Sequence, residues 1–511
     1  MAKNVEIKDH NTLFQSEEYM KSAEKKMEFE APCSLEEVED TAAYLKTEEY
    51  KEKNFAREAL TINPAKACQP LGAVLAALGF EKTLPFVHGS QGCVAYFRSH
   101  FARHFKEPVP TVSTSMTEDA AVFGGLRNLI EGLENAVSLY KPDMVAVSTT
   151  CMAEVIGDDL QAFIETARNE GAISKSFPVP FANTPSFVGS HIVGYDSMMK
   201  SILSYLNGRE GDGEKMAAEA AEKINVIPGF EPYTGNIREA KRILDLMDVR
   251  YTILGDHSDM LDSPANGEYR TYYGGTKLSD AAYASRGKGT IALQKYSTRK
   301  TAKYIEENWG HPFIAGPIPI GIRNTDALLM RISELTGKPI PQSLKDERGR
   351  VVDAMTDSHP YLQGKRVAMA GDPDLLLGLI SLSLELGIEP VHILCTNGDK
   401  EFEEEAQRLL AESPYGLDGK VYVGKDLWHL RSLLLTDPVD FAIGSTFLKF
   451  AAKDANIPLV RVGFPIFDRH HMHRYPIIGY QGTLNLLSLM VNMVLERLDE
   501  EAPGHSFDVV R

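Results

Sequence analysis

The sequence predicts an α/β protein built from doubly wound, mostly parallel sheets. From about residue 61 onward, short apolar stretches alternate with stretches that have the spacing of amphipathic helices, which is typical of such sheets. The clearest unit is β-α-β, with strands at 366–372 and 390–394 on either side of a leucine-rich helix. Because one core seldom holds 511 residues, we expect more than one domain.

The N-terminal segment, residues 1 to about 60, has a different composition. It is rich in Glu and Lys and weakly apolar. Helices with few apolar side chains have little to bury against a core. We therefore expect exposed helical or extended structure that packs as an arm on a partner.

Further strands are expected in chain order after this arm. Apolar stretches that end in turns lie at 144–147, 224–229, 250–256, 441–444 and 459–463. In open α/β sheets, ligands bind beyond the carboxyl ends of the strands. Cys151 lies at such a position, directly after the strand at 144–147.

Three cysteines stand where a turn leads into an expected helix: Cys68, Cys93 and Cys151. Apolar residues recur at helical spacing after each of them. A helix N-terminus carries partial positive charge, so we expect the thiol pKa to be lowered there, and the thiolate is the form that binds metal. Three such placements suggest three thiolates that converge on a soft metal centre, although three buried structural thiols would give the same pattern.

Three is an unusual ligand count, because a closed zinc or iron–sulfur site generally takes four protein ligands. The two other cysteines, Cys33 and Cys395, do not stand at a helix start. The sequence therefore indicates that another polypeptide supplies the remaining ligands.

Composition argues against several classes of function. A net charge of −17 disfavours a nucleic-acid binder, and no stretch approaches the 18 consecutive apolar residues of a membrane span. Five cysteines without a Cys-x-x-Cys pair favour a reducing cytoplasm. The G-x-G-x-x-A match at 287–292 leads into a strand and not out of one, so a dinucleotide site is not predicted.

Two further polar patterns have alternative interpretations. Asp353 and Asp357 share one face of an expected helix at 350–357 that ends before Pro360. They are either a solvated acidic face or ligands of a hard cation. The His-rich tract at 467–474 lacks a metal-binding order and is better explained as a charged loop that packs at an interface.

Long stretches of the chain resemble the β-subunit family of the nitrogenase molybdenum–iron protein. The similarity extends from about residue 45 to the C-terminus, and the most specific motifs lie at 66–72, 86–98, 148–159, 184–191 and 462–470. The resemblance implies three doubly wound, Rossmann-like domains after the arm, which we assign to residues 61–240, 241–360 and 361–511.

The same resemblance implies the cofactors and partners. An [8Fe-7S] P-cluster would be shared with an α subunit in an α2β2 heterotetramer. Its ligands from this chain would be Cys68, Cys93 and Cys151, with Ser186 added when the cluster is oxidised. The chain would relay electrons from the iron protein to the iron–molybdenum cofactor for ATP-dependent reduction of N2 to ammonia. That cofactor and the catalytic site would lie in the α subunit.

Other residues acquire expected roles from the family. Asp353 and Asp357 of one copy, with Glu107 and the carbonyl of Lys106 from another, would bind a divalent cation such as calcium, iron or magnesium. Phe123 would contact the iron protein, although a Phe beside Gly-Gly is more often a core residue.

Tyr96 would lie between that docking surface and the cluster. The alternatives are the β subunit of a vanadium or iron-only enzyme, a cofactor-assembly scaffold, or a redox-silent scaffold.

Overall fold

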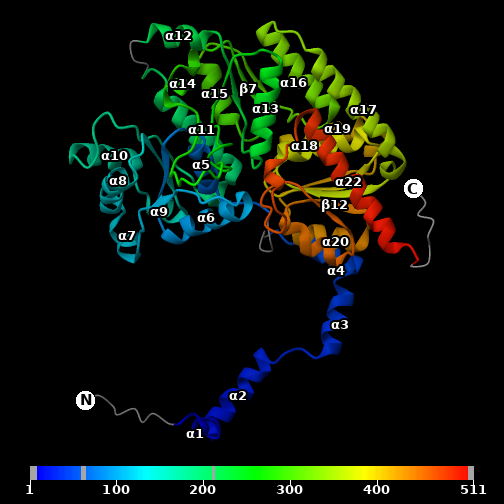
Figure 1. Ribbon diagram of the computed structural model, residues 1–511. Helices are drawn as coiled ribbons and strands as arrows, with labels where there is room; N and C mark the ends of the chain where they lie inside the picture. The colour runs from blue at the N-terminus through cyan, green and yellow to red at the C-terminus, as the bar shows by residue number, and fades with distance from the viewer. Residues whose placement is uncertain (1–8, 59–64, 210–212, 504–511) are drawn as a thin grey trace, which may run out of the picture. The chain divides into compact units, whose positions relative to one another are not determined.

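The computed structural model describes residues 9–58, 65–209 and 213–503. The chain divides into an N-terminal unit that ends at Glu58 and a main unit that starts at Ala59 (Figure 1). The expected end of the arm near residue 60 lies outside the described residues. Within the described part of the chain, no helix is long and apolar enough to span a membrane.

The N-terminal unit consists of short helices, as expected for the arm. They are α1 (His10–Phe14), α2 (Glu17–Glu30), α3 (Leu35–Tyr44) and α4 (Glu48–Phe55). Polar side chains cap each helix start, and Ser34 and Glu37 form a capping box before α3. The described helices α1 to α3 contain no buried residue, so capping and local hydrogen bonds define them more than packing does.

The first sheet of the main unit carries the cysteine-bearing helices. Its order is β2-β1-β3-β4, all parallel, with Phe86 of β1 paired with Val147 of β3. The strands are β1 (Thr83–His88), β2 (Val112–Ser113), β3 (Met144–Thr149) and β4 (Phe181–Ala182). Its helices are α5 (Gln69–Leu78), α6 (Gln91–Phe105), α7 (Glu118–Phe123), α8 (Leu126–Tyr140), α9 (Cys151–Ile156), α10 (Leu160–Asn169), η1 (Ser186–Val188) and α11 (His191–Leu206).

The second sheet has the order β6-β5-β7-β8 and is also parallel. The strands are β5 (Ile224–Ile227), β6 (Tyr251–Ile253), β7 (Thr290–Ala292) and β8 (Phe313–Ala315). The helices are α12 (Glu214–Ala221), α13 (Thr234–Leu246), α14 (Leu278–Ala282), η2 (Ala284–Arg286), α15 (Arg299–Asn308), α16 (Gly321–Thr336) and α17 (Gln342–Leu362).

The third sheet has the order β11-β10-β9-β12-β13 and contains the β-α-β unit that the sequence predicts. The strands are β9 (Arg366–Ala370), β10 (Glu389–Cys395), β11 (Lys420–Val423), β12 (Phe441–Gly444) and β13 (Leu459–Arg461). The helices are α18 (Pro373–Glu385), α19 (Lys400–Ala411), η3 (Pro414–Gly416), α20 (Leu427–Thr436), η4 (Thr446–Leu448), α21 (Lys449–Asp454), η5 (Met472–Arg474) and α22 (Gly479–Glu501).

Three parallel sheets with helices around them confirm the predicted α/β class (Figure 1). Two of the expected domain boundaries fall inside helices. Residue 240 lies inside α13, because the second sheet already begins at Ile224, and residue 360 lies inside α17. The expected helix at 350–357 is also wrong in its bounds. It is part of α17 and continues through Pro360 to Leu362, since a proline near the last turn costs few helical hydrogen bonds.

A close crossing of α5 and α11 fixes the start of α5, where Cys68 lies. At this crossing, the backbones of the two helices are in direct contact. A Cβ atom on Gly72 would lie 1.8 Å from the carbonyl oxygen of His191, and one on Gly194 would lie 1.8 Å from that of Gln69. Only glycine permits such an approach.

Candidate metal centre

The three cysteines stand at helix starts, as predicted. Cys68 is the N-cap of α5, Cys93 lies in the first turn of α6, and Cys151 is the first residue of α9. Strand β1 leads into α6 and strand β3 leads into α9. The fold thus brings two of the thiols to the carboxyl end of one parallel sheet, where such sheets bind ligands.

Electrostatic coupling shows that the three sulfur atoms converge. Burial, with smaller contributions from the charges of Cys93 and Cys151, raises the pKa of Cys68 to about 11. Burial also raises the pKa of Cys93, and the charge of Cys151 adds to this. The expectation of lowered pKa values is therefore wrong for Cys68 and Cys93, because desolvation and mutual repulsion outweigh the effect of the helix N-termini. Both thiols therefore favour the neutral form, and a metal cation would stabilise their thiolate forms.

Ser186 lies against this group of thiols. Its Oγ accepts a hydrogen bond from the backbone N–H of Gln69 at 3.2 Å. A hydrogen bond from the Ser186 hydroxyl lowers the pKa of Cys68, although by less than burial raises it. The side-chain amide of Gln69 donates to the carbonyl of Pro185 at 2.6 Å and so holds the segment of Ser186 at the start of α5.

Tyr96 lies one turn beyond Cys93 in α6 and also borders the thiols. Burial raises the pKa of Tyr96 to about 12, and the charge of Cys68 contributes. The Tyr96 ring packs on the ring of His100, with centroids 3.8 Å apart. The phenol therefore stays neutral beside the sulfur atoms.

The rim of the thiol site is apolar and open to solvent. Cys151 is exposed, and the nearby side chains of Val155 and Phe187 are 75% and 63% exposed. The side chain of Val188 is also exposed. Large apolar side chains gathered at a surface mark an interaction site, so this rim is suited to a partner subunit.

The donor set consists of three thiols and one hydroxyl. Among the described residues, no group of three or more His, Cys, Asp or Glu side chains could hold one metal ion. The three thiols and the Ser186 hydroxyl are nevertheless close enough to affect one another. Soft thiolates spread over this range match the ligands of an iron–sulfur cluster.

Phe123 lies on the surface and not in the core. It is the last residue of α7 and is 87% exposed. Gly124, at φ +87°, turns the chain sharply after it. The general preference of Phe for the core therefore does not hold here.

The residues expected to bind a divalent cation lie in two separate places. Lys106 has a left-handed backbone, φ +64°, at the end of α6, and burial and the charge of Asp262 raise the pKa of the adjacent Glu107. Asp353 and Asp357 are exposed on α17, far from α6 (Figure 1). One copy of the chain therefore does not bring all four together.

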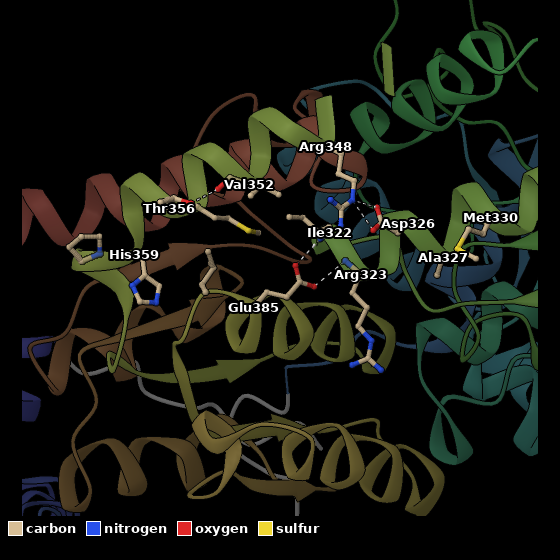
Figure 2. Close-up of a pocket in the computed structure, with 13 residues that line it drawn as sticks. Ile322, Arg323, Asp326, Ala327, Met330, Arg348, Val352, Thr356, His359 and Glu385 are labelled. Atoms are coloured by element: carbon tan, nitrogen blue, oxygen red, sulfur yellow. Dashed lines mark hydrogen bonds and ion pairs between the residues drawn. The ribbon is translucent and has the colours of Figure 1, made fainter. Parts of the chain in front are cut away.

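An apolar cavity of about 900 Å³ lies elsewhere, between α16, α17 and α18 (Figure 2). Its charged side chains are already paired. Arg348 Nε donates to Asp326 at 2.9 Å, and Glu385 accepts from the backbone N–H of Ile322 at 2.8 Å. The cavity is thus separate from the thiols and offers them no reactive group.

Sequence reasoning missed a buried pair, His88 and Asp158. Their Nε2 and Oδ2 atoms are 2.8 Å apart. Both residues lie within the motifs at 86–98 and 148–159. A His directly after an apolar strand and an Asp after a helix-ending Gly157 were the available signals.

Comparison with known proteins gives consistent results. The family model described as "Nitrogenase component 1 type Oxidoreductase" matches residues 68–495, and one described only as a domain of unknown function matches residues 1–54. The chain is 58% identical to the nitrogenase molybdenum-iron protein beta chain of Rippkaea orientalis, with all of both chains covered.

It is 52% identical to the Azotobacter vinelandii beta chain, with 99% of each covered. Among solved structures, a chain of "Nitrogenase Cp1 at pH 6.5" matches with a TM-score of 0.85 and 41% identity, over 89% of this chain and 98% of that one.

Proposed function

The chain belongs to the nitrogenase component 1 type oxidoreductases, and we propose that it supplies one half of an [8Fe-7S] P-cluster at the contact with an α subunit. Its full-length similarity to beta chains makes it the β component of a nitrogenase heterotetramer that contains metal clusters. The names of these relatives favour the molybdenum type over the vanadium, iron-only and scaffold alternatives.

The convergence of Cys68, Cys93 and Cys151 supports this proposal most strongly. Three thiols at helix starts, with an open apolar rim, form an incomplete site that a second subunit can close. The cluster, when bound, supplies reversible one-electron storage. The helix N-termini stabilise its negative charge, and the apolar helices behind them exclude water.

Ser186 is proposed as a ligand that binds only in the oxidised state. Its Oγ already lies beside Cys68 and is oriented by the N–H of Gln69. A hydroxyl ligates poorly until it loses its proton, and oxidation makes iron a harder acceptor for the resulting oxygen anion.

The exposed Phe123 is proposed to bind the reductase, the nitrogenase iron protein. Aromatic side chains that project from a surface are frequent anchors of interfaces, and Val122 beside it is exposed as well. Lys106, Glu107, Asp353 and Asp357 are proposed to bind a divalent cation between two copies of this chain. The proposed compartment is the cytoplasm, since all five cysteines are free.

Iron analysis tests the shared site. The chain expressed alone should hold little iron, whereas co-expression with the α subunit should give a complex with a full cluster. Cys93→Ala should lower the iron content of that complex, and Cys33→Ala, in the exposed arm, should leave it unchanged. A full cluster on the isolated chain would contradict the proposal.

A further inference from the structure

A buried, hydrogen-bonded His–Asp pair lies between the docking segment and the thiol-bearing helices. His88 ends β1, the strand that leads to Cys93, and Asp158 follows α9, the helix that begins with Cys151. Both side chains are almost fully shielded from solvent, and Nε2 lies 2.8 Å from Oδ2. Burial lowers the pKa of His88, and its Nε2 atom lies within hydrogen-bond distance of the Asp158 carboxylate.

The same carboxylate holds the segment that follows Phe123. The backbone N–H of Gly125 donates to both oxygens of Asp158, at 3.2 Å each. The contact is tight, because a Cβ on Gly125 would lie 2.6 Å from Cε1 of His88 and 2.7 Å from Oδ2 of Asp158. A movement of the segment that contains Phe123 and Gly125 would therefore displace the side chains of His88 and Asp158.

A second contact joins the two regions. Ala120 of α7 and Ala153 of α9 are buried together with Met116, and Met152 and Ile156 pack around them. Helix α7 ends at Phe123 and helix α9 begins at Cys151. Because these side chains are closely packed, a displacement of α7 would also displace α9, the helix that begins with Cys151.

We propose that Asp158 is a positioning residue that transmits binding of a reductase at Phe123 to the thiols of Cys93 and Cys151. The inference rests on the proposed function, because it needs the docking surface and the cluster. One carboxylate connects three segments, namely the turn after α7, the end of β1 and the turn after α9. Without it, docking would still occur, but the thiol-bearing helices would no longer respond as one unit.

The test compares Asp158→Ala with Asp158→Asn in the complete heterotetramer. In Asp158→Ala we expect normal iron content, normal reduction by dithionite and an unchanged KM for the reductase. The rate of electron transfer from the reductase should fall about tenfold. Asp158→Asn should restore most of that rate, because its Oδ1 can still accept from Gly125.

Asp159→Ala is the matched control. Asp159 is the neighbouring carboxylate, but it caps α10 by accepting from the N–H of Ala162 at 3.1 Å. Its loss should leave the electron-transfer rate unchanged. A normal rate in Asp158→Ala would overturn the proposal, as would a rate that falls only in proportion to lost iron in both Asp158 variants.

Failure of the proposed docking surface would give a different result from failure of the proposed role of Asp158. If Phe123→Ala left the KM for the reductase unchanged, the docking assignment would fail. Failure of the transmission role appears instead as an unchanged rate in Asp158→Ala with a functional docking surface.

Discussion

The crossing of α5 and α11 predicts a severe effect of Gly194→Ala on the metal centre. The added Cβ would lie 1.8 Å from the carbonyl oxygen of Gln69, the residue that follows Cys68. Real Cβ atoms do not approach within 3.0 Å, so the backbones must separate by more than 1 Å. The obstacle is backbone, which cannot rotate away as a flexible side chain can.

The change in the free energy of unfolding in Gly194→Ala is the sum of a steric cost and a gain in helix propensity. Overpacking a close contact costs about 3 kcal/mol or more, and the separation also weakens packing along both helices. Replacing Gly by Ala within a helix stabilises the helix by about 1 kcal/mol, because Ala has the higher helix propensity. We expect a net loss of about 2–4 kcal/mol in the free energy of unfolding, with Cys68 displaced from the other two thiols.

Thermal unfolding and iron content of the purified heterotetramer would measure both effects. Gly349→Ala is the matched control, because Gly349 lies within α17 and a Cβ there meets no atom within 4 Å. It should be neutral or slightly stabilising. Equal stability and full iron content in Gly194→Ala would refute the argument that this crossing positions Cys68.

Three further perturbations test other parts of the structure. Ser186→Ala should change the spectrum of the oxidised cluster and leave that of the reduced cluster nearly unchanged; equal changes in both states would count against a redox-dependent ligand. Asp357→Ala, or removal of divalent cations by a chelator, should promote dissociation of the tetramer in sedimentation experiments. Asp346→Ala on the same helix should not. A metal-free crystal of an intact tetramer would argue against the cation. Burial raises the pKa of Glu231 from 4.5 to about 8, so the folded chain binds this proton more tightly than the unfolded chain does. Stability should therefore decline as pH rises through that window, by at most about 1.4 kcal/mol per pH unit, and Glu231→Gln should remove this slope in pH-dependent thermal unfolding.

The predicted fold depends on local patterns, which explains its agreement with the structure. Alternating apolar stretches and helical spacing are properties of short segments, and so are the turns that place Cys68, Cys93 and Cys151 at helix starts. The start of the second sheet at Ile224 is harder to predict, because only two residues separate α12 from β5.

The electrostatics of the site could not be predicted from local sequence. The raised pKa of Cys68 depends on burial and on two thiols from distant segments, so a rule based on helix starts alone gives the wrong direction. His88 and Asp158 are 70 positions apart, and the local signals at each residue do not show that the two side chains meet. Such pairs become visible only when the tertiary structure brings them together.

The open rim around Cys151 has a consequence for biosynthesis. In the chain alone, the Cys151 thiol and the apolar side chains of Val155 and Phe187 are exposed. An exposed apolar patch of this kind favours association of unassembled copies with one another. We therefore expect balanced synthesis of both subunits to limit the aggregation of this chain.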